Sequence, residues 1–104
     1  MINITTQDFK NYFNARGLVW PEKSDQALKF LISEIGELAD ADVANEDEWI
    51  RNNPNSQRRT DFEISDVMMM LFVYADLKGL DPHQCVYEKI LSKGYDLIEL
   101  REDL

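Results

Sequence analysis

The sequence is poor in the residues that build redox and transition-metal sites. It has one cysteine, Cys85, and one histidine, His83, among 104 residues. A single cysteine excludes an intramolecular disulfide and a zinc–thiolate cluster, and we expect Cys85 to be partly buried and unreactive. A di-iron four-helix bundle needs two Glu-x-x-His motifs, which one histidine cannot supply. Any metal site of this chain would therefore be built from oxygen ligands.

Basic residues are also few. The chain has 11 Lys and Arg against 20 Asp and Glu, which gives a formal net charge of −9. Binding to a nucleic-acid backbone needs a basic surface, so we expect no nucleic-acid partner. A nucleoside triphosphate is a polyanion as well, and this chain would need cations to hold one.

Long apolar runs are absent from the sequence. No run approaches the roughly 20 residues of a membrane span, and Met1 is not followed by the basic region and apolar core of a signal peptide. We therefore expect no membrane association and a cytoplasmic location.

The length of the chain predicts one domain over residues 1–104, with a radius of gyration of about 13 Å. A domain of this size buries only about two-thirds of the surface that its unfolded chain exposes. We therefore expect a homo-oligomer that supplements the core.

The remaining pattern predicts an all-α, four-helix bundle-like fold. Helices are expected over residues 6–16, 24–44, 60–78 and 82–93, and the third could begin near Gln57. Capping residues precede these segments, and glycines follow three of them. Residues 67–73 are apolar nearly all round, which predicts that another subunit covers one face of the third helix. In the fourth helix we expect three buried residues: Val86, Ile90 and Leu91.

Two carboxylate pairs stand at i, i+3 spacing: Glu34 with Glu37, and Glu63 with Asp66. On a helix, such residues lie about 5–6 Å apart on one face. If the two helices face each other, each pair of like charges at about 5 Å costs roughly 3 kcal/mol at an effective dielectric constant of about 20. A divalent cation would offset this repulsion, and oxygen ligands suit Mg²⁺, with Mn²⁺ as the alternative ion. Because Thr60 lies three residues before it, Glu63 also fits a capping box.

The residues beside the carboxylates carry two further expectations. Ile35 and Ile64 lie on apolar stripes that we expect to point inward. Gly36 inside a helix costs about 1 kcal/mol relative to alanine, and we expect a close approach of two helices to compensate.

The two pairs and their flanking residues resemble the MazG-type nucleotide pyrophosphohydrolases of the all-α NTP pyrophosphatase superfamily. That family has an ExxE motif, an insert of variable length and an ExxD motif. Here 25 residues, 38–62, separate the pairs. The segment SEIGELAD (33–40) is similar to the family's EvGELAe, FEISDVMMML (62–71) to its ELsDVLiyL, and EKI (88–90) to its EKi. The resemblance covers about residues 20–93.

The resemblance implies Mg²⁺-dependent hydrolysis of a (deoxy)nucleoside triphosphate to the monophosphate and pyrophosphate, as in house-cleaning of the nucleotide pool, by a homodimer or homotetramer. It implies that Glu34, Glu37, Glu63 and Asp66 are the metal ligands. Glu37 is favoured as general base because one carboxylate must keep an oxygen free for water, and Glu34 is its catalytic neighbour.

Four further residues are candidates for substrate binding. The resemblance places Lys89 at the phosphates and Trp20 near the base, although Trp20 also suits a hydrophobic plug between helices. Lys93 is a further candidate, and it stands in the segment after EKI where many members of the family carry an Asn followed by Arg-Tyr. In the polar insert, Arg59 either contacts phosphates or only balances the charge of the acidic site. Lys89 could equally form a solvated pair with Glu88 or Asp96.

Two other functions fit the same residues. Phosphoribosyl-ATP pyrophosphohydrolase belongs to the same superfamily and shares its helices and carboxylates. From a different class, a non-catalytic helical oligomer could bind a nucleotide or protein partner and use the carboxylates as a solvated acidic face.

Overall fold

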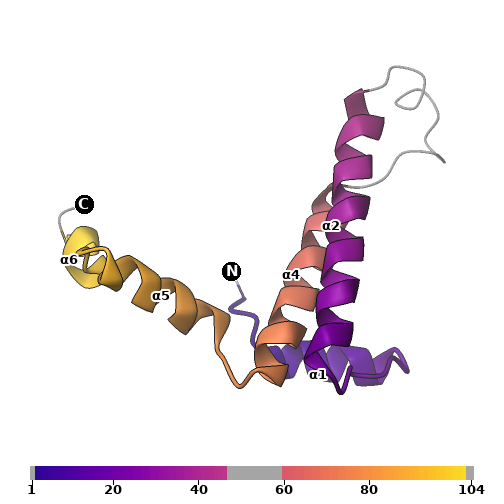
Figure 1. Ribbon diagram of the computed structural model, residues 1–104, viewed down its shortest axis with the longest axis horizontal. Coiled ribbons are helices and arrows are strands. Elements are labelled where there is room, and N and C mark those ends of the chain that lie inside the picture. Colours follow the sequence, from indigo (N-terminus) through magenta and orange to yellow (C-terminus); the bar gives the residue numbers. More distant parts are fainter. Residues whose placement is uncertain (1, 47–59, 103–104) are drawn as a thin grey trace.

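The computed structural model describes residues 2–46 and 60–102, whose regular elements are all α-helices (Figure 1). Because no strand occurs among these residues, the predicted all-α class is confirmed for them. The predicted helix ends that fall within these ranges lie within two residues of the observed helix ends. The alternative start near Gln57 lies outside the described residues. The helices are α1 (Thr6–Ala15), α2 (Ser24–Glu46), α4 (Thr60–Leu77), α5 (Pro82–Ser92) and α6 (Leu97–Glu102). Of the helices in this part of the chain, none is long and apolar enough to cross a membrane.

The helices α2 and α4 run antiparallel and side by side as a hairpin, and α1 lies across one end of it (Figure 1). Ala27, Ala41 and Val73 are fully buried in the seam between α2 and α4, and Leu31 is almost so. The small side chains of Ala27 and Ala41 take up little space where these two helices pack. The ring of Phe72 in α4 meets Phe9 of α1 edge to face, with ring centroids 5.0 Å apart.

A short turn sets the direction in which the chain leaves α4. Gly79 has a φ of +69°, which favours glycine, and the amide of Leu80 donates to the carbonyl of Ala75 at 2.8 Å. The carboxylate of Asp81 accepts from two amides in the first turn of α5, at 2.8 and 3.1 Å, and Pro82 occupies the first helical position. The residues between Leu77 and Pro82 therefore serve to end α4 and to cap α5, which fixes the direction of α5.

Helices α5 and α6 form an arm that points away from the hairpin (Figure 1). Among the described helices, α5 contacts α4 and α6 but not α2. Val86 is 58% exposed and Leu91 46% exposed, whereas Ile90 is half-buried. The prediction that α5 buries Val86 and Leu91 is therefore wrong for the single chain, because the turn before α5 holds it away from the hairpin.

The open arm also explains the dimensions of the molecule. The radius of gyration is 17.2 Å, above the 13 Å predicted from chain length, and the chain extends over 48 × 37 × 27 Å. In place of four aligned helices, the described part of one chain has a hairpin, a crossing helix and an arm.

One face of the hairpin is apolar and uncovered, contrary to expectation. Ile35 is 49% exposed and Ile64 is 45% exposed. Successive helical residues are separated by about 100° around the axis, so when Glu34 faces α4, Ile35 turns away from it. On each of the two helices, other exposed apolar residues at i, i+4, i+7 spacing extend the apolar stripe to which Ile35 or Ile64 belongs. We call these six residues the hairpin apolar face: Leu28, Ile32 and Ile35 of α2, and Ile64, Met68 and Leu71 of α4.

Gly36 does not mark a close approach of helices in the single chain. A Cβ atom built there would meet no heavy atom within 4 Å, and the residue is exposed. We therefore expect Gly36→Ala to raise the free energy of unfolding by about 1 kcal/mol, because alanine has the higher helix propensity. Urea unfolding measures this effect, and Ala39→Gly, an exposed site in the same helix, should lower stability by a similar amount. A destabilising Gly36→Ala would contradict the open environment of this residue.

Candidate metal centre

Four carboxylates lie in the middle part of the α2–α4 hairpin. Glu34 and Glu37 are one turn apart on α2, and Glu63 and Asp66 are one turn apart near the start of α4. The hairpin is antiparallel, so the second half of α2 lies beside the first turns of α4. Glu63 is in the first described turn of α4, where a carboxylate also stabilises the helix N-terminus.

The structure brings three of these side chains into one cluster. Glu34, Glu37 and Glu63 each offer a carboxylate oxygen, and these oxygens lie within 4.8 Å of one another. All three residues are half-buried. Asp66 lies beside them: with Glu34 it lines a cavity of about 200 Å³ whose other walls are α1 residues, Leu18 and two methionines of α4. We call the four residues the acidic cluster.

The carboxylates of the acidic cluster perturb one another. The pKa of Glu34 is raised from 4.5 to about 7, first by burial, then by the charge of Glu37 and a hydrogen bond with it, and then by the charges of Asp66 and Glu63. Burial and the charge of Glu37 also raise the pKa of Asp66. Near neutral pH the cluster therefore favours a shared proton between Glu34 and Glu37, with Glu34 as donor.

One carboxylate oxygen of Glu34 lacks a hydrogen-bond partner in the part of the chain that the structure describes. Oε2 of Glu34 is buried and has no hydrogen bond there. A buried carboxylate oxygen without a donor costs free energy, which a proton or a cation would recover. The donor set is oxygen only, as Mg²⁺ and Mn²⁺ prefer. The residues present therefore fit a hard divalent cation.

The two predicted phosphate ligands that the structure describes, Lys89 and Lys93, are not part of the cluster. Lys89 lies on α5 and Lys93 caps its end, and both are exposed on the arm that does not contact α2. Arg59 lies outside the described residues. The single chain therefore brings the carboxylates together without Lys89 and Lys93.

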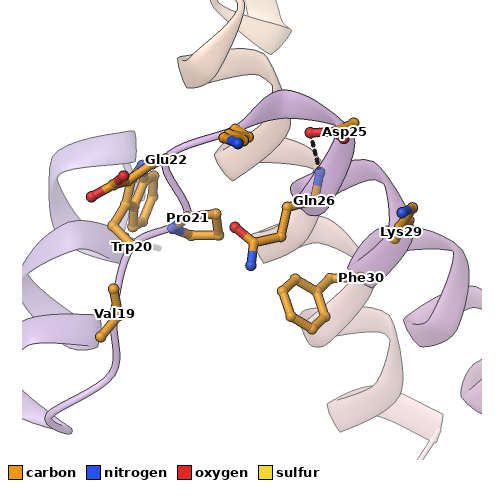
Figure 2. Close-up of a pocket in the computed structure, with 9 residues that line it drawn as sticks. Val19, Trp20, Pro21, Glu22, Asp25, Gln26, Lys29 and Phe30 are labelled. Carbon is orange, nitrogen blue, oxygen red and sulfur yellow. Dashed lines mark hydrogen bonds between the residues drawn. The ribbon is translucent and has the colours of Figure 1, made fainter.

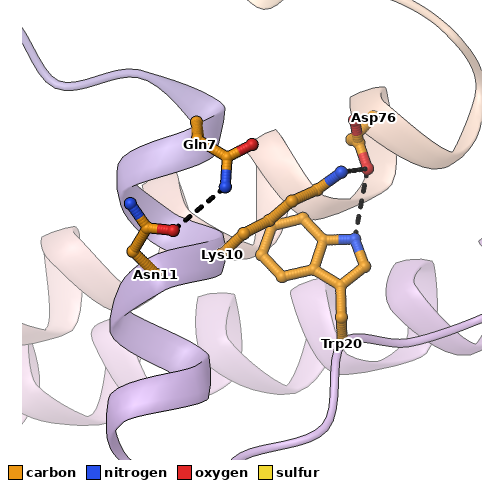
Figure 3. A network of polar contacts seen from close by, with 5 residues as sticks. All are labelled: Gln7, Lys10, Asn11, Trp20 and Asp76. Carbon is orange, nitrogen blue, oxygen red and sulfur yellow. Dashed lines mark hydrogen bonds and ion pairs between the residues drawn. The ribbon is translucent and has the colours of Figure 1, made fainter.

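Trp20 packs between α1 and α4 (Figure 3). Its indole Nε1 donates to the carboxylate of Asp76 at 3.2 Å, and Nζ of Lys10 lies 3.1 Å from the same carboxylate oxygen. The ammonium of Lys10 also lies 5.4 Å from the indole centroid, and Phe13 meets the indole edge to face at 5.1 Å. These contacts agree with the interpretation of Trp20 as a plug between helices.

Trp20 also lines a hollow of about 610 Å³ at the start of α2 (Figure 2). Pro21, Gln26 and Phe30 form other parts of its wall, with two acids and two lysines around them. None of the four carboxylates lines this hollow; the acidic cluster opens into the separate cavity beside Phe13. A nucleobase in contact with Trp20 would therefore lie in a different hollow from the cavity that Glu34 and Asp66 line.

We expect Trp20→Phe to lower the free energy of unfolding by about 1–2 kcal/mol, because it removes the hydrogen bond to Asp76 and part of the packed ring. Thermal unfolding measures this change. As a matched control, Asp76→Asn keeps an acceptor for the indole while removing the charge that pairs with Lys10. A raised KM for a nucleotide with unchanged stability would contradict the structural role and support a base contact.

Sequence reasoning missed Lys10 and Asp76 as partners of Trp20. Asp76 is 56 residues from Trp20, so no local pattern connects them. One signal was present: Asp76 is the only charged residue in the apolar stretch 67–77. A lone carboxylate in such a stretch usually has a partner, because burying it unpaired is costly.

Comparison of this chain with protein-family models, with curated proteins and with solved structures finds no match.

Proposed function

We propose that this chain is a Mg²⁺-dependent nucleoside triphosphate pyrophosphohydrolase. It would hydrolyse a (deoxy)nucleoside triphosphate to the monophosphate and pyrophosphate, in the cytoplasm, as part of nucleotide-pool house-cleaning. The observation that carries the proposal is the acidic cluster, in which oxygens of Glu34, Glu37 and Glu63 lie within 4.8 Å of one another on two facing helices. The resemblance of the two motifs to the MazG-type family supports the choice of reaction.

Glu34, Glu37, Glu63 and Asp66 would hold the ion. When bound, Mg²⁺ would neutralise charge on the triphosphate oxygens, which the acidic chain would otherwise repel. The buried Oε2 of Glu34 suits a ligand role, because it has no donor among the described residues. Glu37 would accept the proton that the attacking water loses, and Glu34 beside it would hold Glu37 in position.

The phosphate contacts proposed for Lys89 and Lys93 are not made in the single chain, because α5 does not contact α2. We therefore propose that the enzyme is a homo-oligomer, a dimer or a tetramer, in which a neighbouring chain supplies these lysines. A lysine ammonium is a flexible point charge that suits phosphate oxygens.

The test is a panel of canonical and modified triphosphates, assayed for pyrophosphate release with Mg²⁺, with Mn²⁺ and with chelator. We expect release that requires the metal and is retained in Asp40→Asn, which changes an exposed carboxylate of α2 outside the cluster. Hydrolysis of phosphoribosyl-ATP alone would instead favour that branch of the superfamily. Binding of nucleotides without any hydrolysis would show a non-catalytic protein and refute the proposal.

A further inference from the structure

The cavity beside the acidic cluster has an acidic wall and an apolar wall. Glu34 and Asp66 form the acidic part, whereas α1 and the turn after it supply Tyr12, Phe13 and Leu18. The volume of about 200 Å³ is below the roughly 300 Å³ at which pockets for small organic ligands begin. The cavity can therefore hold one group of a ligand but not a whole nucleotide.

Arg16 is held against the Tyr12 side of this wall. Its Nη1 donates to the hydroxyl of Tyr12 at 3.1 Å, and its guanidinium carbon lies 5.8 Å from the centroid of the Tyr12 ring. The backbone is fixed as well, because the amide of Arg16 donates to the carbonyl of Tyr12 at 3.0 Å and Gly17, with a φ of +68°, ends the helix. A guanidinium has five N–H donors, so the contact with Tyr12 leaves most of them available.

The charge of Arg16 is not neutralised within the described part of the chain. The ion pair found among residues 2–46 and 60–102 joins Lys10 to Asp76. Arg16 has a neutral hydroxyl as its side-chain partner, and it is exposed. Tyr12 therefore holds the guanidinium in place without cancelling its charge, which remains for an anion from outside.

The other basic residues of the described ranges lie elsewhere. Lys10 is paired with Asp76 (Figure 3). Lys78 follows the end of α4, 12 residues after Asp66, which is about 18 Å at 1.5 Å per residue. The remaining ones line the hollow of Trp20 or lie on the arm: Lys23 and Lys29 at the hollow, and Lys89, Lys93 and Arg101 on the arm. Arg16 is therefore the described cation that is hydrogen-bonded to the wall of this cavity.

We propose that Arg16 binds a phosphate group of the triphosphate beside the cavity that Glu34 and Asp66 line, and that Tyr12 positions its guanidinium. This inference rests on the proposed hydrolysis and adds a phosphate contact from the same chain as the carboxylates. A planar guanidinium can donate two parallel hydrogen bonds to one phosphate. Its charge would offset part of the repulsion between a polyanion and an acidic chain, alongside the metal ion. This contact does not need the lysines of the arm.

The first test is a double-mutant cycle on the kinetics of hydrolysis with Mg²⁺. Arg16→Gln removes the charge and should raise KM about 10- to 100-fold, with kcat within about threefold of the wild type. Arg16→Lys keeps the charge without the planar fork, so its KM should lie between these two. Tyr12→Phe keeps the ring but releases Arg16, and it should raise KM about threefold in the wild type and leave KM unchanged in Arg16→Gln.

The matched control is Lys78→Gln, the same loss of charge at an exposed residue after α4. Its KM should stay within about twofold of the wild-type value. Circular dichroism should show equal helix content in all of these proteins. An equal rise of KM in Lys78→Gln and Arg16→Gln would show an effect of overall charge and would overturn the contact.

The second test measures binding without turnover. Titration calorimetry gives the affinity for Mg²⁺ alone and for inorganic pyrophosphate in saturating Mg²⁺. In Arg16→Gln the affinity for Mg²⁺ should stay within about twofold, whereas pyrophosphate should bind about 10- to 100-fold more weakly. Lys78→Gln should bind both as the wild type does.

The outcomes separate this inference from the proposed reaction. If the wild type releases no pyrophosphate from any triphosphate, the proposed hydrolysis fails, while the pyrophosphate titration still decides the role of Arg16. If the wild type hydrolyses triphosphates and Arg16→Gln keeps both its KM and its pyrophosphate affinity, hydrolysis stands and the contact is overturned. A wild type that binds Mg²⁺ but no pyrophosphate would also overturn it.

Discussion

Replacing Glu37 with glutamine is expected to reduce the rate of triphosphate hydrolysis by about 1,000-fold while the fold remains intact. The amide is nearly isosteric with the carboxylate but cannot accept a proton from water. The variant removes one of the charges that raise the pKa of Glu34, so without metal it should also be more stable than the wild type. Steady-state pyrophosphate release and thermal unfolding in chelator measure the two effects.

The control for Glu37→Gln is Asp40→Asn, the same chemical change one turn along α2 and outside the acidic cluster. It should leave the rate within about twofold and stability within about 0.5 kcal/mol. If both variants lose activity equally, the effect is one of overall charge and Glu37 has no special role. If Glu37→Gln keeps full activity, Glu37 is not the base.

The second large effect expected is a pH dependence of stability that is largely cancelled when Mg²⁺ is added. Without metal, the folded state binds a proton at Glu34 with a pKa of about 7, above the unfolded value of 4.5. The folded chain therefore holds more protons between these values, and stability should fall as pH rises from about 4.5 to above 7. The loss is at most about 3 kcal/mol, and screening by solvent at this half-buried side chain lowers it.

Saturating Mg²⁺ should restore stability above pH 7, because the ion binds the ionised carboxylates. At a concentration of 100 times Kd, binding adds about 2.7 kcal/mol. Urea unfolding at pH 6 and pH 8, in Mg²⁺ and in chelator, measures both effects. In Glu34→Gln the metal-free dependence on pH should largely disappear. Identical unfolding curves with Mg²⁺ and with chelator at pH 8 would show that the acidic cluster binds no ion.

The helices could be predicted because their starts and ends depend on neighbouring residues. Asp81 before Pro82, and glycine at position 79, act within one turn of the chain, and the structure has these ends where the sequence predicts them. The approach of Glu34 and Glu37 to Glu63 was predictable for a related reason. The i, i+3 spacing fixes each pair on one face, and two facing helices need only an antiparallel hairpin to join them.

The direction of α5 and the exposure of Ile35 and Ile64 could not be predicted in the same way. An apolar stripe indicates that a face needs cover, but it does not show whether the same chain or another provides it. Glu34 and Ile35 are adjacent on a helix and point about 100° apart, so they could not both face α4 as predicted. The contact of Trp20 with Asp76 depends on the crossing of α1 over the hairpin, which is a property of the whole fold.

The packing beside the acidic cluster has a consequence for the choice of ion. Leu31 lies three residues before Glu34 and Ala41 lies four residues after Glu37, and both side chains are buried. Buried side chains on either side of the cluster would oppose a wider separation of its carboxylates. Mg²⁺ sits about 2.0–2.1 Å from its ligands, whereas Ca²⁺ needs 2.3–2.6 Å and a larger, more flexible shell. If the cluster binds an ion, the buried Leu31 and Ala41 would thus favour the smaller cation.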